Sequence, residues 1–184
     1  VYKRQLIAPI AFILTISMDI FASPSERPNI LLIMAEDMSH RVGAFGDPVA
    51  ITPNLDELAS RSLLYPNTFT TAGVCSPSRA AQILGRHQIS TGTQHMRAKA
   101  FKESSYRSVP PPNIKAYPEL LRRAGYHTFV MNKLDYQFSD VFEKSGPYSI
   151  WDYEGSSQYL NRRTNGQPFF GFVTYYEKHE SKII

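Results

Sequence analysis

Residues 27–37 read Arg27-Pro28-Asn29-Ile30-Leu31-Leu32-Ile33-Met34-Ala35-Glu36-Asp37, and this stretch indicates the fold. Residues 30–35 are continuously apolar and lack the polar spacing of an amphipathic helix, which is typical of a buried strand in a parallel sheet. Glu36 and Asp37 follow that strand at once. Because ligand sites in open α/β sheets lie beyond the carboxyl ends of the strands, the two carboxylates are well placed to hold a hard cation. A solvated turn with two acids is the alternative.

Two later segments repeat the pattern of an apolar strand followed by polar residues. A short helix is expected from Tyr117 to Ala124, and the strand from Tyr126 to Met131 follows it, with Lys133 just beyond. Residues 167–176 are expected to form another buried strand, which ends shortly before His179. A lysine or histidine at such a place is either solvated or part of a ligand site.

The chain between the first two of these strands is expected to contain a helix and one more strand. Thr52 can cap a helix over residues 53–59, with Pro53 at its first position. Residues 62–69 are then expected to form a strand that leads to the loop before Cys75.

The single cysteine stands in Cys75-Ser76-Pro77-Ser78-Arg79, with Gly85 six residues after the arginine. If Cys75 immediately precedes a helix, Pro77 sits in the first turn, where its missing N–H costs nothing. Ser76 and Ser78 can then offer hydroxyls to the N–H groups of that turn, whose partial positive charge favours an anion. Arg79, one turn on, can point its guanidinium at the same anion. The pattern predicts a sulfate or phosphate site, although an isolated cysteine is more often a small buried residue.

The Cys75 motif resembles the signature of the sulfatase family, in which the cysteine is oxidised to formylglycine after translation. The strand that ends in Glu36 and Asp37 is similar to the family's calcium-binding strand, and residues 52–59 are similar to its Thr-Pro-Asn-Leu-Asp segment. The resemblance implies an α/β fold of the alkaline-phosphatase/sulfatase type, with a mixed, mainly parallel sheet flanked by helices. It also implies a sulfuric ester or sulfamate hydrolase that acts on a sulfated carbohydrate or a small sulfate ester.

The site residues implied by this resemblance fall into two groups. Calcium would be held by Glu36, Asp37 and the modified Cys75, which a formylglycine-generating or sulfatase-maturating enzyme would produce. Arg79 and Lys133 would offset negative charge in the reaction. His179 is the candidate for substrate contact or for the general acid, since its near-neutral pKa suits proton transfer.

Two positions depart from the commonest family pattern. Glu36 stands where most members have aspartate, and Asp135 stands two residues after Lys133, where many have histidine. Asp135 and the His-Glu-Ser run at 179 resemble the branch that includes heparan N-sulfatase. No role is assigned to Asp135, because a carboxyl group donates a proton at neutral pH only if its pKa is raised.

Alternative functions are a phosphate or phosphonate monoester hydrolase of the same superfamily, and an inactive remnant that at most binds glycans. The net charge of +4 favours an anionic substrate, while the basic residues are scattered without interleaved aromatic residues, so nucleic acid is not expected as a partner. His40, His87, His95 and His127 are interpreted as surface or packing residues.

Residues 1–23 are expected to be a signal peptide that directs export to the periplasm or the medium, since an apolar run over residues 6–21 follows Lys3 and Arg4. Asp19 interrupts that run, so no stable membrane span is expected. Residues 1–5 resemble an artefact of sequencing-library construction. Residues 27–184 are expected to be the amino-terminal part of a catalytic domain, incomplete at its carboxyl end, which predicts an unpaired sheet edge and an exposed apolar face.

Overall fold

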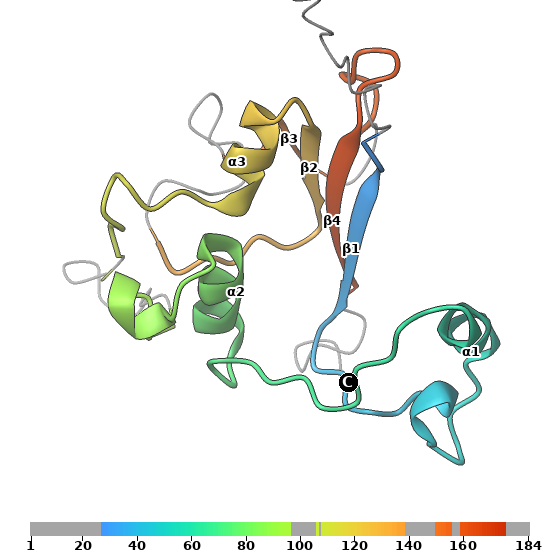
Figure 1. The fold of residues 1–184 in the computed structure, drawn as a ribbon. Helices are drawn as coiled ribbons and strands as arrows, with labels where there is room; N and C mark the ends of the chain where they lie inside the picture. Colours follow the sequence, from blue (N-terminus) through green and yellow to red (C-terminus); the bar gives the residue numbers. More distant parts are fainter. Residues whose placement is uncertain (1–26, 97–105, 107, 139–149, 156–158, 176–184) are drawn as a thin grey trace, which may run out of the picture.

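The computed structural model describes residues 27–96, 106, 108–138, 150–155 and 159–175. They contain a four-stranded sheet with the strand order β1-β4-β2-β3 (Figure 1). The strands are β1 (Ile30–Ala35), β2 (His127–Met131), β3 (Tyr153–Glu154) and β4 (Phe169–Tyr175). All three pairings between them are parallel. The predicted α/β fold is confirmed, and the sheet is parallel throughout its described strands rather than mixed.

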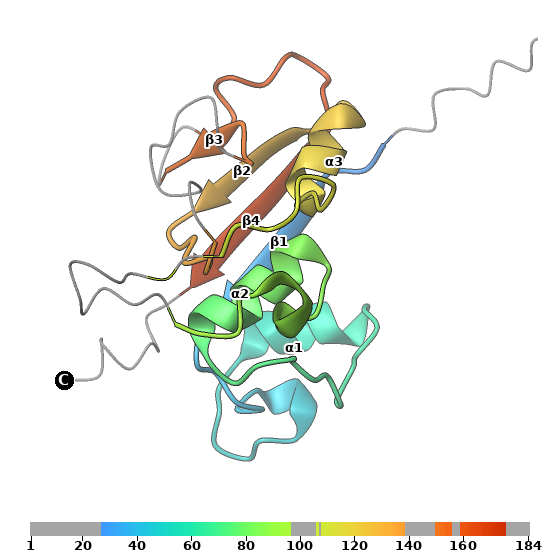
Figure 2. The same ribbon diagram turned by 90° about the vertical axis from the view of Figure 1, so that its left-hand side faces the viewer.

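The helices are α1 (Pro53–Ser60), α2 (Cys75–Leu84) and α3 (Tyr117–Arg123). Two short 3-10 turns, Gly43–Phe45 and Gln88–Thr91, complete the helical elements of the described ranges. Helices α2 and α3 cover one face of the sheet, while α1 lies beyond the carboxyl end of β1 (Figures 1 and 2). The carboxyl ends of the strands and the start of α2 therefore lie at the same end of the molecule.

The main core lies between the sheet and these two helices. Phe170 and Phe172, which alternate along β4, are 4% and 0% exposed and face this core together with Val130 of β2 and Ile83 of α2. Trp151 stacks on Phe170 with 5.8 Å between ring centroids and an interplanar angle of 11°. Burial of each phenylalanine contributes about 1.5–3 kcal/mol, so the core fixes α2 on the sheet and with it the position of Cys75.

The opposite face of the sheet is closed locally by an aromatic ring over a glycine. Phe129 of β2 is paired in register with Gly171 of β4. A Cβ atom at position 171 would lie 2.7 Å from Cε2 of the Phe129 ring, so the ring occupies the space above the glycine. Phe129 also stacks on Tyr159 at 4.6 Å. This contact requires glycine at position 171 and locks β2 against β4.

Two expectations about strands were wrong or incomplete. Residues 62–69 do not form a strand: they belong to an exposed loop, in which Pro66 also lacks the N–H that a ladder needs. The strand Ile30–Ala35 has the predicted bounds, but among the described strands it lies at the edge of the sheet and is not fully buried. Leu31 and Ile33 are 52% and 66% exposed, which agrees with the predicted apolar edge.

No helix within the described ranges is long and apolar enough to cross a membrane. The predicted signal peptide over residues 1–23 lies outside the described residues.

Candidate active site

A pocket of about 950 Å³ lies at the carboxyl end of β1, next to the start of α2. Its wall includes Glu36 and Asp37 from the end of β1, the loop of residues 68–74, and Cys75 and Arg79 from α2. The structure therefore brings the two acids together with the cysteine and the arginine, although they are far apart in the chain.

Cys75 is the first residue of α2, and Val74 is the N-cap, so the helix begins one residue earlier than predicted. Pro77 lies in the first turn, as expected, and Gly85 ends the helix in the left-handed conformation with φ 58°. The serines do not cap the helix in the predicted way. Ser78 Oγ lies 2.6 Å from Thr70 Oγ1, and this hydrogen bond joins α2 to the loop that forms the pocket wall.

Arg79 is only 2% exposed, and its guanidinium joins α2 to the ends of the strands. Its Nε donates to the Leu134 carbonyl at 2.9 Å, and its Nη2 donates to Thr174 Oγ1 at 2.8 Å and to the Lys133 carbonyl at 2.5 Å. Its Nη1 lies 3.0 Å from Glu36 Oε1. In this structure protein acceptors take the donors of the guanidinium, while Arg79 still lines the pocket, and its contact with an anion stays a prediction.

Glu36 is buried between two cations, Arg79 and Lys133. Its Oε2 lies 2.5 Å from Lys133 Nζ, which is also 3.5 Å from Asp135. Burial by itself raises the Glu36 pKa, but the Lys133 hydrogen bond and the two positive charges outweigh burial and hold the pKa below its ordinary value. For Lys133, burial lowers the pKa, and the Glu36 hydrogen bond and nearby negative charges outweigh it. Both groups are therefore ionised at neutral pH.

The environment of Cys75 makes its thiolate unfavourable. Burial raises the pKa of the thiol above its ordinary value, and the charges of Glu36, Asp135 and Asp37 act in the same direction, whereas Lys133 opposes them. A cysteine used as a nucleophile needs a lowered pKa. The site therefore does not favour thiolate chemistry at position 75.

Three non-glycine residues at this end of the sheet adopt positive φ angles: Asp37 at 51°, Asn132 at 77° and Asp135 at 49°. Such residues are uncommon and cluster at functional sites. Asn132 is held there because its Nδ2 donates to the Thr174 carbonyl at 2.8 Å, which joins the end of β2 to β4.

The donors fit part of a calcium site. Glu36 and Asp37 offer the carboxylate oxygens that calcium prefers, and they are adjacent at the carboxyl end of a strand. Calcium needs six to eight oxygen ligands, and the described residues contain no group of three or more His, Cys, Asp or Glu side chains that could hold a metal. Both Glu36 oxygens also contact cationic side chains. These residues could supply a part of the ligand set but not all of it.

His179 lies outside the described residues, so its predicted role rests on the sequence. The sequence reasoning missed Thr174 and Asn132, which position Arg79 and the end of β2. Thr174 carried a usable signal, because it is a polar residue at the same alternate positions of β4 as Phe170 and Phe172, and it is fully buried.

Comparison with solved structures supports the fold. The chain is similar to BT1596, a 2-O GAG sulfatase, with a TM-score of 0.60 and 20% identity, over 83% of this chain and 35% of that one. The chain thus has an α/β fold of the kind seen in that sulfatase structure.

The sequence profile of the Sulfatase family matches residues 28–182, and the chain belongs to that family. It is 39% identical over 163 residues to the ulvan-active sulfatase of Formosa agariphila. This match covers 86% of this chain and 26% of the relative. It is 38% identical over 112 residues to human N-acetylgalactosamine-6-sulfatase. This match covers 59% of this chain and 22% of the relative. The chain therefore spans about a quarter of the length of these curated relatives.

Proposed function

We propose that the protein containing this chain hydrolyses a sulfuric ester or sulfamate of a sulfated carbohydrate, with Cys75 converted to formylglycine. The observation that carries the proposal is the position of Cys75. It begins α2 and lines a pocket together with Glu36 and Asp37. Relatives named for action on ulvan and N-acetylgalactosamine support a carbohydrate substrate.

The protonation state of Cys75 supports modification rather than direct use of the thiol. Burial raises the pKa of the thiol, so little thiolate is present at neutral pH. Formylglycine would instead supply a hydrated aldehyde as the nucleophile, and calcium would polarise the sulfate oxygens. Membership of the Sulfatase family agrees with this chemistry.

The residues of the chain have separable tasks in this proposal. Lys133, whose side chain is 18% exposed, provides a positive charge that can stabilise the charge on a transferring sulfuryl group. Arg79 fixes the Glu36 carboxylate and the backbone at Lys133 and Leu134. His179 remains our candidate for protonating the leaving group.

The finer assignments also belong to the proposal. The aspartate at position 135, which lies 3.5 Å from Lys133 Nζ, resembles the sulfamidase-like branch in sequence, and on that resemblance we propose that N-sulfated as well as O-sulfated sugars are possible substrates. Residues 1–23 are proposed to direct export, and a formylglycine-generating or sulfatase-maturating enzyme is the proposed partner.

The test combines chemistry at position 75 with turnover. The full-length protein, produced with a formylglycine-generating enzyme, should show an aldehyde at residue 75 by mass spectrometry of the peptide and by hydrazide labelling. It should hydrolyse 4-nitrophenyl sulfate in preference to 4-nitrophenyl phosphate, and Cys75→Ala should abolish both labelling and turnover. Full turnover with an intact thiol would overturn the formylglycine assignment, and preferred hydrolysis of the phosphate would favour the phosphomonoesterase alternative.

A further inference from the structure

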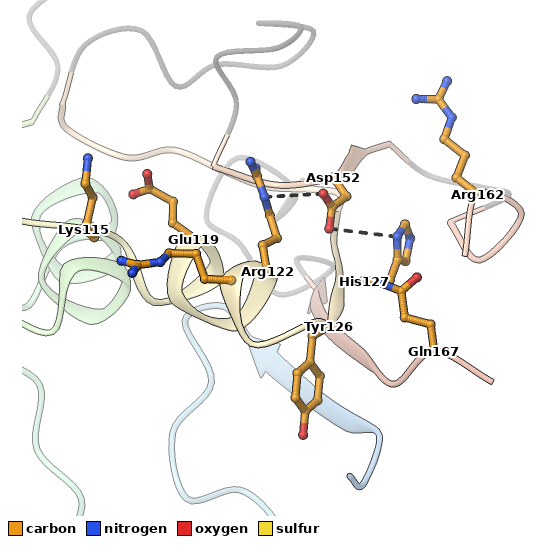
Figure 3. Close-up of a pocket in the computed structure, with 9 residues that line it drawn as sticks. Lys115, Glu119, Arg122, Tyr126, His127, Asp152, Arg162 and Gln167 are labelled. Carbon is orange, nitrogen blue, oxygen red and sulfur yellow. Dashed lines mark ion pairs between the residues drawn. The ribbon is translucent and has the colours of Figure 1, made fainter. Parts of the chain in front are cut away.

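A second pocket, of about 690 Å³, lies at the opposite end of the sheet from Cys75. It is built around the end of α3 and the start of β2, and residues 152, 162 and 167 complete its wall (Figure 3). The nine lining residues are Lys115, Glu119, Arg122, Arg123, Tyr126, His127, Asp152, Arg162 and Gln167.

Positive charge predominates in this distal pocket. Four lining side chains are cationic and two are carboxylates, leaving His127 aside. Both carboxylates already have structural tasks. Glu119 Oε2 accepts the Ala116 N–H at 2.8 Å as part of the capping box of α3. Asp152 Oδ2 accepts the Thr128 N–H at 2.8 Å, and its Oδ1 lies 3.4 Å from Arg122 Nε.

The remaining cations are available to a ligand. Lys115 and Arg123 are exposed and form no ion pair within the described ranges. Arg162 is exposed as well, and its Cζ lies 5.9 Å from the centroid of the Tyr153 ring. Behind them lies the buried His127, whose Nε2 is 2.8 Å from the Tyr159 carbonyl.

The spread of the charges indicates the shape of the ligand. Lys115 and Arg162 lie at opposite sides of the pocket, with Arg122 and Asp152 between them (Figure 3). A single oxyanion contacts one side of such a pocket at a time, whereas an extended molecule with several negative groups contacts both sides. A guanidinium group can donate two parallel hydrogen bonds to two oxygens of the same anionic group, a geometry that suits sulfate and carboxylate substituents.

The lining also discriminates between two kinds of polyanion. Tyr126 and His127, the aromatic side chains of the wall, are 9% and 4% exposed, and the Tyr126 side chain points away from the cations (Figure 3). Single-stranded nucleic acids gain much of their affinity from base stacking on open aromatic faces. This pocket offers no such face within its described lining.

We propose that the distal pocket is an exosite for a sulfated oligosaccharide, separate from the site at Cys75. This inference rests on the proposed function, because it assigns a second contact to the same class of polymer. A polymer bound at the exosite is held at a high effective concentration near the protein, which favours long sulfated chains over single sugars.

The test measures binding of a fluorescein-labelled heparin oligosaccharide, as a sulfated-glycan probe, to the full-length Cys75→Ala protein. Lys115→Gln, Arg123→Gln and Arg162→Gln should each weaken binding by about fivefold, the upper range for one exposed charge contact. Arg61→Gln removes an exposed arginine next to α1 and serves as the matched control, with unchanged affinity expected. Thermal unfolding of each variant reports whether its fold is intact.

Equal losses in the pocket variants and in Arg61→Gln would overturn the proposal, because binding would then follow overall charge. Single-stranded DNA of matched charge is tested as well. If it binds as tightly as the heparin oligosaccharide and depends on the same pocket arginines, the assignment of the ligand class is overturned. Turnover of 4-nitrophenyl sulfate by the Cys75-containing protein is measured separately. If the protein shows no turnover but the pocket variants bind the glycan more weakly, the proposed function alone is contradicted. If turnover is normal but the pocket variants bind the glycan as tightly as the parent protein, the exosite alone is contradicted.

Discussion

Arg79 shows how one side chain can hold a site together at the residue scale. It is buried, and its contacts with Glu36, the Lys133 and Leu134 carbonyls and Thr174 connect α2 to the ends of the strands. Arg79→Ala would leave Glu36 buried with one of its two cationic partners. Lys133 would still compensate the Glu36 charge, but buried acceptors such as the Leu134 carbonyl would lose their donor. An unsatisfied buried polar group costs about 1–3 kcal/mol, so we expect a loss of at least that order in the free energy of unfolding, measured in urea.

Two variants sharpen this prediction. Arg79→Lys keeps the charge but loses the planar fork, so it should recover only a part of the loss. Arg86→Ala, at an exposed arginine just after α2, should change stability by less than about 0.5 kcal/mol. Similar losses for Arg79→Ala and Arg86→Ala would show that the buried contacts contribute little.

Cys75 provides a second prediction at this scale. In protein made without formylglycine-generating activity, the rate of alkylation by iodoacetamide should rise with pH through an apparent pKa above the ordinary value of 9.0, because burial and the nearby carboxylates disfavour the thiolate. Asp135→Asn should lower that apparent pKa, since it removes one of the negative charges. The same thiol in urea is the reference, and an apparent pKa below that of the unfolded protein would contradict the structure.

At the scale of elements, the contact between β2 and β4 depends on Gly171. Gly171→Ala would place a methyl group against the Phe129 ring, with Cε2 at 2.7 Å, in a buried part of the sheet. Overpacking of this kind costs about 1–3 kcal/mol, which should appear as a lower midpoint in urea unfolding. Gly73→Ala is the matched control, because no heavy atom lies within 4 Å of the place that its new methyl group would take, and its stability should be nearly unchanged. An equal loss in both variants would argue against the close Phe129 contact.

The elements also show what local sequence can predict. The bounds of β1 were predicted without error and the start of α2 to within one residue, because apolar runs, Pro77 and Gly85 are local signals. The loop of residues 62–69 was mistaken for a strand because a strand also needs a partner, which local sequence does not reveal. The role of Arg79 depends in the same way on acceptors from distant segments, Leu134 and Thr174.

The distal pocket illustrates the same limit across the whole molecule. Its cations come from positions 115, 122, 123 and 162, which are scattered in the sequence and gather only in the fold. The grouping of Glu36, Asp37 and Cys75 was easier to predict, because the two acids follow a strand and the cysteine begins a helix, and ligand sites lie beyond the carboxyl ends of parallel strands.

The last prediction concerns the apolar edge of the whole 184-residue chain. Leu31 and Ile33 are 52% and 66% exposed on β1, which pairs only with β4 within the described sheet. Because an unpaired strand with exposed apolar residues templates association, the chain should self-associate with rising concentration in sedimentation velocity experiments. Ile33→Lys should reduce this association, since a charge on an edge strand opposes pairing. Leu63→Lys removes a leucine that is 82% exposed in a loop and should have a smaller effect. A monomeric wild-type chain, or an equal effect of both substitutions, would show that the β1 edge does not drive association.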